Sequence, residues 1–151
     1  MAIRDILILP DKRLREVSAP VDAITDEVRT LVTDMYETMY DAPGIGLAAI
    51  QVGVPLRVVV TDCSPREEEA EPLTLINPEV TRPANARVRF MDLEGQTQEM
   101  DVDGLLSTCI QHEVDHLDGK LFIDYLSTFK RSRVVSKFKK QARQREKAAA
   151  G

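Results

Sequence analysis

The chain has 151 residues, of which 43% are hydrophobic and 30% are charged, a composition typical of a soluble globular protein that can bury a core in one domain. No apolar run approaches the length of a membrane-spanning helix, and Ile6–Leu9, which follows the charged Arg4 and Asp5, does not resemble a signal peptide, so we expect a cytoplasmic protein with no membrane partner. The two cysteines, Cys63 and Cys109, are too few for a disulfide framework.

Charge is distributed unevenly along the chain. The net charge is −5, but from Thr128 onward nine Lys and Arg residues face one glutamate, giving +8, which leaves −13 on residues 1–127. We therefore expect a boundary between an acidic body at 1–127 and a basic C-terminal helix or tail at 128–151. Such a tail is typical of a segment that binds an anionic partner. The alternative is a solvated helix whose charges keep it soluble.

The clearest predicted helix follows a turn or brief helix that ends near Arg15. Thr25 can cap its N-terminus, and Asp26 and Glu27 lie in the first turn, where the helix dipole favours negative charge. The helix should end before Pro43. The spacing of its apolar residues predicts a buried stripe that consists of Val28, Leu31, Val32, Met35 and Met39.

The segment 44–53 has two glycines one residue apart and one glutamine, Gln51, inside an apolar run. Glycines allow the backbone to approach a ligand closely, and a buried amide needs hydrogen-bond partners. The segment lacks the phosphate-loop pattern. Two interpretations stay open, a tight turn with a core glutamine and a substrate-binding edge.

The next elements read as strands. Val54–Asp62 is rich in valine, as a buried strand would be. A second strand begins at Leu73, and Asn77-Pro78 should end it. Glu94-Gly95 suits a hairpin turn between two later strands. The predicted strands span residues 54–62, 73–76, 87–93 and 96–102.

The two histidines of the chain, His112 and His116, occur in the pattern His-Glu-x-x-His on a predicted helix that Asp103 caps and Gly119 follows. Residues four apart share one helix face, so both imidazoles can bind one metal ion. The carboxylate of Glu113, next to the first histidine, can take a proton from a metal-bound water. The alternative is a chance match on a solvated helix face.

Two protein ligands are too few for a catalytic zinc-type centre, which has three. A metzincin would place a third histidine where Phe122 stands, and the only acid in the tail, Glu146, is a poor candidate for a gluzincin ligand. Cys109 lies about 10.5 Å along the helix axis from His116, which argues against a thiolate bond to the same metal. Nothing around Cys63 supports it as a ligand.

The motifs resemble those of bacterial peptide deformylases over nearly the whole chain and in the same order. The segments that carry the resemblance are Ile8-Leu9-Pro10-Asp11, Gly44-Ile45-Gly46-Leu47-Ala48-Ala49-Ile50-Gln51, Leu75-Ile76-Asn77-Pro78, Gln111-His112-Glu113-Val114-Asp115-His116-Leu117-Asp118-Gly119 and Lys120-Leu121-Phe122-Ile123-Asp124-Tyr125-Leu126.

This resemblance implies an α+β fold in which antiparallel sheets surround a central helix that carries both histidines. It implies a metal-dependent hydrolase that removes the formyl group from the N-terminal formylmethionine of nascent polypeptides. The metal of the family is Fe²⁺, which Zn²⁺, Ni²⁺ or Co²⁺ can replace. Family members also dock on the ribosome through a C-terminal helix, which makes the ribosome an expected partner of the basic tail.

The resemblance also assigns roles to residues. His112 and His116 match the two histidine ligands, Glu113 matches the general acid and base, and Gln51 matches the amide that stabilises the oxyanion. The positions that match substrate contacts are Ile45, Gly46, Leu105 and Cys109.

One family signature, Glu-Gly-Cys-Leu-Ser, has no counterpart in this chain. In the family its cysteine is the third metal ligand, and it lies between the Asn-Pro strand and the strand that matches Arg87–Leu93. Here Val80 is followed almost directly by Arg82-Pro83, so about twenty residues are missing by comparison. Two explanations stay open, a natural deletion and a shortened chain.

Two functions therefore stay open. The first is an active deformylase-type hydrolase. The second is a deformylase-like binding module that has lost turnover and recognises peptide N-termini or the ribosome.

Overall fold

The structure is a computed structural model that describes residues 2–8, 11–64, 70–81 and 86–120, together with 136, 137, 139–141, 143 and 144. The described residues of the C-terminal tail are helical, as predicted. The predicted domain boundary at 127 and 128 lies outside the described residues. No helix of the described residues is long and apolar enough to cross a membrane.

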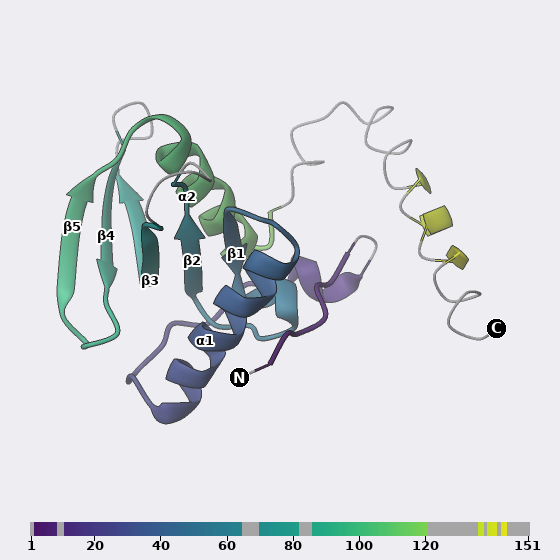
Figure 1. The fold of residues 1–151 in the computed structure, drawn as a ribbon, viewed down its shortest axis with the longest axis horizontal. Coiled ribbons are helices and arrows are strands. Elements are labelled where there is room, and N and C mark those ends of the chain that lie inside the picture. The colour runs from purple at the N-terminus through teal and green to yellow at the C-terminus, as the bar shows by residue number, and fades with distance from the viewer. Residues whose placement is uncertain are drawn as a thin grey trace.

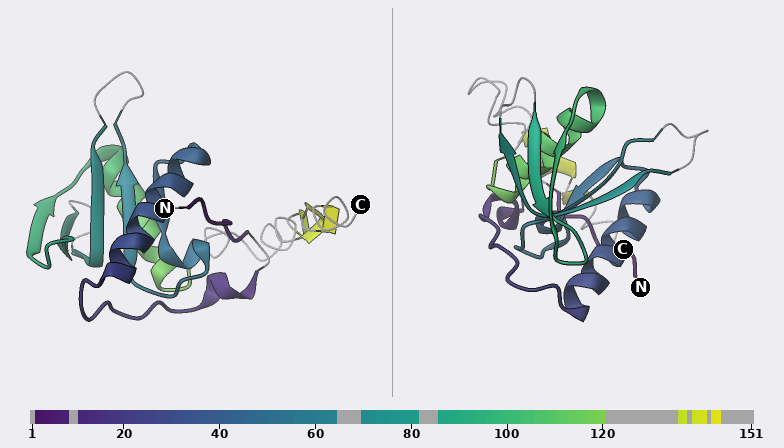
Figure 2. Two further views of the ribbon diagram at one scale, coloured as in Figure 1. Left: turned by 60° about the horizontal axis from the view of Figure 1, so that its bottom comes forward. Right: turned by 90° about the vertical axis from the view of Figure 1, so that its left-hand side faces the viewer.

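The described residues form one antiparallel sheet between two helices (Figures 1 and 2). The sheet has five strands in the order β1-β2-β3-β4-β5, so each strand pairs with its neighbour along the chain. The elements are η1 (Lys12–Arg15), α1 (Asp26–Asp41), β1 (Gly46–Ala48), η2 (Ala49–Val52), β2 (Val58–Asp62), β3 (Pro72–Thr81), β4 (Arg87–Met91), β5 (Thr97–Asp101) and α2 (Gly104–Leu117).

Strand β2 is buried on both faces. Val58 and Val60 belong to the hydrophobic cluster of α1, with Met35, whereas Val59 belongs to the cluster of α2, with Ile110. Side chains alternate across a strand, so α1 covers one face of the sheet and α2 covers the other. This explains why β2 reads as a continuous valine run rather than as an alternating one.

Helix α1 forms as the sequence predicts. The hydroxyl of Thr25 accepts a hydrogen bond from the Val28 N–H, and the helix ends at Asp41, before Pro43. All five residues of the predicted apolar stripe are buried. The helix is therefore held to the sheet by a face that the sequence specifies locally.

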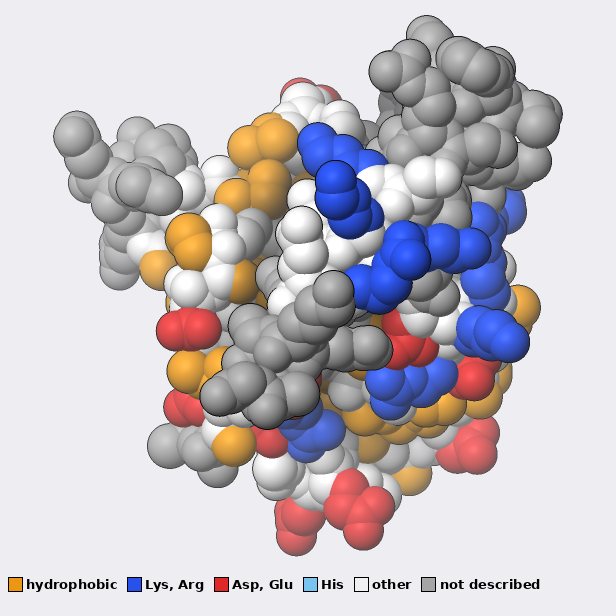
Figure 3. All heavy atoms as spheres, turned by 90° about the vertical axis from the view of Figure 1, so that its right-hand side faces the viewer, with side chains coloured by type: hydrophobic (Ala, Val, Ile, Leu, Met, Phe, Trp, Pro, Cys, Tyr) orange, Lys and Arg blue, Asp and Glu red, His pale blue; other side chains and the backbone are white. Residues whose placement is uncertain are grey.

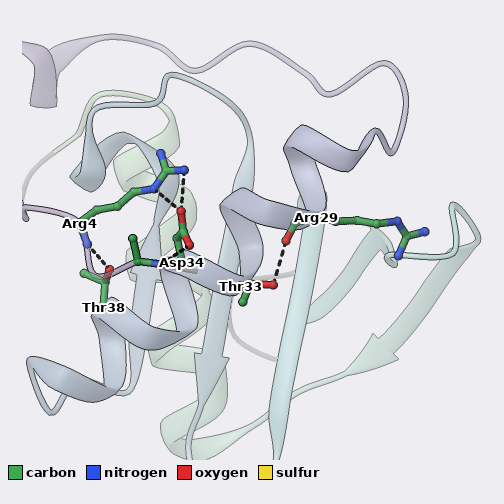
Figure 4. Close-up of polar contacts among 6 residues, drawn as sticks. Arg4, Arg29, Thr33, Asp34 and Thr38 are labelled. Atoms are coloured by element: carbon green, nitrogen blue, oxygen red, sulfur yellow. Dashed lines mark hydrogen bonds and ion pairs between the residues drawn. The ribbon is translucent and has the colours of Figure 1, made fainter.

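The N-terminal segment is fastened to α1 by polar contacts (Figure 4). Asp34 accepts hydrogen bonds from the Ala2 N–H at 2.7 Å and from Nε of Arg4 at 2.9 Å, and the Arg4 N–H donates to the Thr38 hydroxyl at 2.9 Å. The hydrogen bond from Ala2 is the main cause that lowers the pKa of Asp34. The buried carboxylate is therefore ionised and satisfied.

The prediction that Asn77-Pro78 ends a strand is wrong, because β3 continues to Thr81. The pairing with β4 shifts register between Ile76 and Glu79, and Asn77 has a positive φ of 52°. The Asn77 side chain accepts from the Val21 N–H at 2.8 Å and donates to the Val21 carbonyl at 2.9 Å. A bulge fixed by these two hydrogen bonds lets the strand pass a proline.

Three further expectations are corrected. The segment 44–53 is not a simple turn, because it contains β1 and η2. The strand predicted to start at Val54 begins only at Val58, since Leu56 instead forms a parallel bridge with Ala19. Asp103 occupies the N-cap of α2, but its side chain makes no capping hydrogen bond.

Replacing Gly119 by alanine should destabilise the protein strongly. Gly119 has a φ of 74°, and a Cβ there would lie 2.4 Å from the carbonyl oxygen of Arg15. Gly95 is a matched control, with a φ of 80° and no atom within 4 Å of its Cβ position. We expect Gly95→Ala to cost about 1 kcal/mol of unfolding free energy from backbone strain alone. Gly119→Ala should cost about 2 kcal/mol more, because backbone must move to relieve the clash.

Urea unfolding of both variants at one temperature measures this difference. Equal losses in the two variants would show that α2 does not depend on its close contact with η1.

Candidate active site

Helix α2 carries both histidines and Glu113, and Glu113 lies close to strand β1. The rings of His112 and His116 are stacked, with centroids 6.4 Å apart and planes 19° apart. His112 is exposed, whereas His116 is partly buried and its Nδ1 has no hydrogen-bond partner among the described residues. Burial, followed by the charge of His112, lowers the pKa of His116. A neutral imidazole with an unpartnered nitrogen is the form that binds a metal.

Strand β1 lies directly against α2 at Gly46. A Cβ on this residue would lie 2.5 Å from Sγ of Cys109 and 3.2 Å from Cγ of Glu113. Sγ of Cys109 also lies 3.6 Å from the carbonyl oxygen of Ile45. Any side chain at position 46 would push the strand away from α2, so glycine is required for the close approach.

Gln51 and Glu113 meet at one backbone N–H. The Ala48 N–H donates to Oε1 of Gln51 at 2.9 Å, and it also hydrogen-bonds to Glu113. Because this contact occupies the amide oxygen, the NH₂ group of Gln51 is left as a donor. Gln51 is half-buried in η2, so its amide is not the fully enclosed core glutamine that one interpretation expected.

Glu113 has an unusually high pKa for a carboxyl group. Burial raises its pKa to about 7, and the hydrogen bond from Ala48 opposes part of this rise. Its Oε2 is buried and has no hydrogen-bond partner among the described residues. A carboxylate that titrates near neutral pH and has a free oxygen is suited to accept and return a proton.

The predicted substrate contacts lie along one edge of this arrangement. Ile45 and Leu105 are 41% and 57% exposed, which is unusual for large apolar side chains, and Cys109 is buried beneath Ile45. Leu105 is one turn before Cys109 on α2. The structure thus brings Ile45, Gly46 and Cys109 together, while Leu105 joins them through its helix alone.

The donor set fits a divalent metal in part. His112 and His116 supply two imidazoles on one helix face. The buried Nδ1 of His116 has no hydrogen-bond partner among the described residues, so it is available to bind a metal ion. All the histidines and cysteines of the chain are among the described residues. Yet no group of three His, Cys, Asp or Glu side chains within the described ranges could hold a metal. Within the described ranges, neither Cys63 nor Cys109 forms such a group with the two histidines.

Comparison with known proteins identifies the fold and the family. The model of the family described as polypeptide deformylase matches residues 3–82 and 79–132. The chain belongs to the polypeptide deformylase family. A peptide deformylase of Afipia carboxidovorans is 56% identical over 167 aligned residues, which cover 95% of this chain and 98% of that protein. One of Bradyrhizobium diazoefficiens is 50% identical over 97% of this chain and all of that protein.

Solved deformylase structures share the architecture. The enzyme of Ehrlichia chaffeensis has a TM-score of 0.87 at 33% identity and covers 94% of this chain and 98% of its own. The enzyme of Legionella pneumophila has a TM-score of 0.85 at 37% identity and covers 95% of this chain and 98% of its own. The predictions of the family, of an α+β fold and of a deformylase-type hydrolase that acts on a formyl amide are confirmed.

The alignments also locate the missing segment. The family model matches in two parts that meet at residues 79–82, where the signature with the cysteine ligand was expected. The Afipia alignment has 167 positions, whereas 95% of 151 residues is about 143, so about 24 positions have no residue in this chain. Strand β3 ends at Thr81, so this break falls at the end of β3, where its last residues pair with β4.

One contributor to the site was missed by the sequence analysis. The Ala48 N–H joins Gln51 to Glu113, but a backbone group leaves no mark on residue type. Only its place between Gly46 and Gln51, inside the deformylase motif, could have drawn attention to it.

The stability of the metal-free protein should depend on pH through Glu113. Its pKa is about 7 when folded, against an ordinary value of 4.5, so the folded protein binds the proton more tightly than the unfolded chain. The stability from this group is fully present below pH 4.5 and is lost as the pH rises through 7. The difference corresponds to roughly 3 kcal/mol.

Denaturant unfolding of chelator-treated wild type and Glu113→Gln between pH 4.5 and 8 measures this effect. The glutamine variant keeps the shape of the side chain but does not titrate, so its stability relative to wild type should rise with pH. A constant difference would contradict a raised pKa.

Proposed function

We propose that Glu113 and Gln51 carry out formyl hydrolysis in this chain, with the formylmethionine of a nascent polypeptide held along β1. The single observation that supports this most is the meeting of Gln51 and Glu113 at the Ala48 N–H, next to Gly46. The carboxyl group of Glu113, the amide of Gln51 and the backbone of β1 at Gly46, where no side chain obstructs the strand, therefore lie next to one another.

Each residue has a chemical task in this proposal. Glu113 accepts a proton from the attacking water and passes it to the leaving amine, and formate departs as the C–N bond breaks. The NH₂ group of Gln51 donates to the oxygen on which negative charge develops. Ile45 and Gly46 contact the substrate, and the methionine side chain lies among Ile45, Leu105 and Cys109.

His112 and His116 would hold the divalent metal, for which we propose Fe²⁺, with Zn²⁺, Ni²⁺ and Co²⁺ as alternatives. When bound, such an ion polarises a carbonyl and lowers the pKa of water. With two protein ligands, we expect weaker binding than at a site with three. Because the reaction concerns new polypeptides, we propose that the protein acts in the cytoplasm.

The alternative function is a binding module that keeps the peptide site without turnover. The observation that favours it is the lack of a third ligand group among the described residues. Peptide recognition through Ile45 and Gly46 does not need that ligand, whereas turnover would depend on how well two histidines retain the metal.

Hydrolysis of formyl-Met-Ala-Ser by metal-loaded protein tests the two functions. We expect wild type to release a free amine, and Glu113→Gln to lower kcat by a factor of about 10² to 10⁴, the usual contribution of a general base. Glu99→Gln is the matched control, because Glu99 is exposed on β5 and forms a surface ion pair with Arg87, away from Glu113 and the histidines. The same assay should be run with each of the four metals.

Turnover that is equal in wild type and Glu113→Gln would refute the role of Glu113. Wild type that binds the peptide without any turnover would instead favour the binding module.

We further propose that the basic tail at 128–151 docks on the ribosome. Its nine Lys and Arg residues can replace the cations that surround RNA phosphates. Lys and Arg side chains of the described residues also gather on the face of the molecule seen in Figure 3. A surface with this charge favours an anionic partner.

Deletion of residues 128–151 should abolish co-sedimentation with ribosomes at low salt. A second variant that keeps the tail but replaces its nine Lys and Arg residues by glutamine separates charge from length. Both variants should lose binding while formyl-peptide hydrolysis is unchanged. Binding that survives in the neutral variant would exclude an electrostatic contact.

A further inference from the structure

The carboxylate of Asp62 is the most heavily hydrogen-bonded side chain near the substrate strand. Asp62 ends β2 and is 6% exposed. Its Oδ2 accepts from the Tyr40 hydroxyl at 2.5 Å, and its Oδ1 accepts from the Ser64 hydroxyl at 2.6 Å. Oδ1 also accepts from the backbone N–H groups of Ser64 and Glu71, both at 3.2 Å. A buried carboxylate with this many donors is held in one position.

The backbone of the same residue holds the beginning of the substrate strand. The Asp62 N–H donates to the carbonyl oxygen of Ile45 at 2.9 Å, and Thr61 pairs with Gly46 in the sheet. The other neighbour of that oxygen is Sγ of Cys109, at 3.6 Å. The Ile45 carbonyl is therefore fixed between β2 and α2.

Asp62 thereby fastens both ends of one short loop. Residues 42–45 join the end of α1, at Asp41, to the start of β1, at Gly46. Tyr40, in the last turn of α1, bonds to the Asp62 side chain, and Ile45 bonds to the Asp62 backbone. Because Asp62 is bonded to both ends of the loop, it restrains the loop conformation. That conformation determines the positions of Ile45 and Gly46.

We propose that Asp62 is a positioning residue, which fixes Ile45 and Gly46 for the peptide substrate through Tyr40, Ser64 and its own backbone. The inference rests on the proposed function, since it assumes that the peptide lies along β1. The hydrogen bonds of the Asp62 carboxylate within the described residues go to Tyr40, Ser64 and Glu71, and none goes to Glu113 or either histidine. Its loss should therefore weaken substrate binding and leave the proton-transfer step nearly intact.

Kinetics of metal-loaded Asp62→Ala with formyl-Met-Ala-Ser test this directly. We expect KM to rise about tenfold while kcat changes by less than about twofold, because the lost interaction orients the substrate rather than the reacting groups. Asp62→Asn should restore most of the wild-type KM. Its amide oxygen can still accept from Ser64 and Glu71, and its NH₂ group can donate to the Tyr40 oxygen.

Asp34→Ala is the matched control for a merely structural effect. Asp34 is also a buried carboxylate that accepts hydrogen bonds from a distant segment, but these come from Ala2 and Arg4 rather than from the loop before β1. This variant should lose stability with an unchanged KM. A tenfold rise of KM in Asp34→Ala, or equal effects on kcat and KM in Asp62→Ala, would overturn the proposal.

A second variant covers the case in which Asp62→Ala does not fold. Tyr40→Phe removes one hydroxyl from a half-exposed ring, and it should raise KM about threefold in the same direction. An unchanged KM in this variant would overturn the role of the Tyr40 contact.

The outcome is separable from failure of the proposed function. If wild type lacks turnover, the proposed hydrolysis fails, and calorimetric binding of the product Met-Ala-Ser then replaces KM as the measured quantity. Weaker binding by Asp62→Ala, with recovery in Asp62→Asn, supports positioning. Equal binding by all three proteins would overturn it.

Discussion

The site depends first on the close approach of β1 to α2 at Gly46. With Sγ of Cys109 and Cγ of Glu113 2.5 Å and 3.2 Å from the Cβ position of Gly46, the strand and the helix are separated by little more than backbone and one layer of side-chain atoms. This distance brings the Ala48 N–H to Glu113 and places Gln51 on the same N–H. If the strand and the helix were farther apart, Ala48, Gln51 and Glu113 would no longer meet.

The sheet makes this approach possible because helices cover it on both faces. The cluster around Met35 holds β2 from the side of α1, and the cluster around Ile110 holds it from the side of α2. Burial also removes water from Glu113 on α2, and this loss of solvent raises its pKa to about 7. The packing that stabilises the fold thus also sets the chemistry of the carboxyl group.

Local periodicity predicted the elements whose partners are close in sequence. The stripe of α1, its Thr25 cap and the extent of the histidine helix follow from spacing and capping residues, and all three are confirmed. The path of β3 past Asn77 could not be predicted in this way, since it depends on Val21, 56 residues away. The role of the Ala48 N–H was equally hidden, because patterns of residue types carry no information about backbone donors. The residues of the site were thus found by motif, while the contacts that join them required the fold.

The break in the family match shows that the sheet and its core form without the missing signature. Where relatives carry about 24 further aligned positions, β3 and β4 pair directly, with Glu79 opposite Arg89 and Val80 opposite Val88. Val88 is fully buried in the cluster of α2, so this hairpin closes the core without the missing signature. The TM-score of 0.87 to a deformylase therefore reflects core packing that forms in this chain without the signature. The contacts around Glu113, which involve β1, η2 and α2, form without the missing signature, and both histidines lie on α2. Under the proposed function, the missing segment therefore affects metal binding, while the geometry around Glu113 is retained.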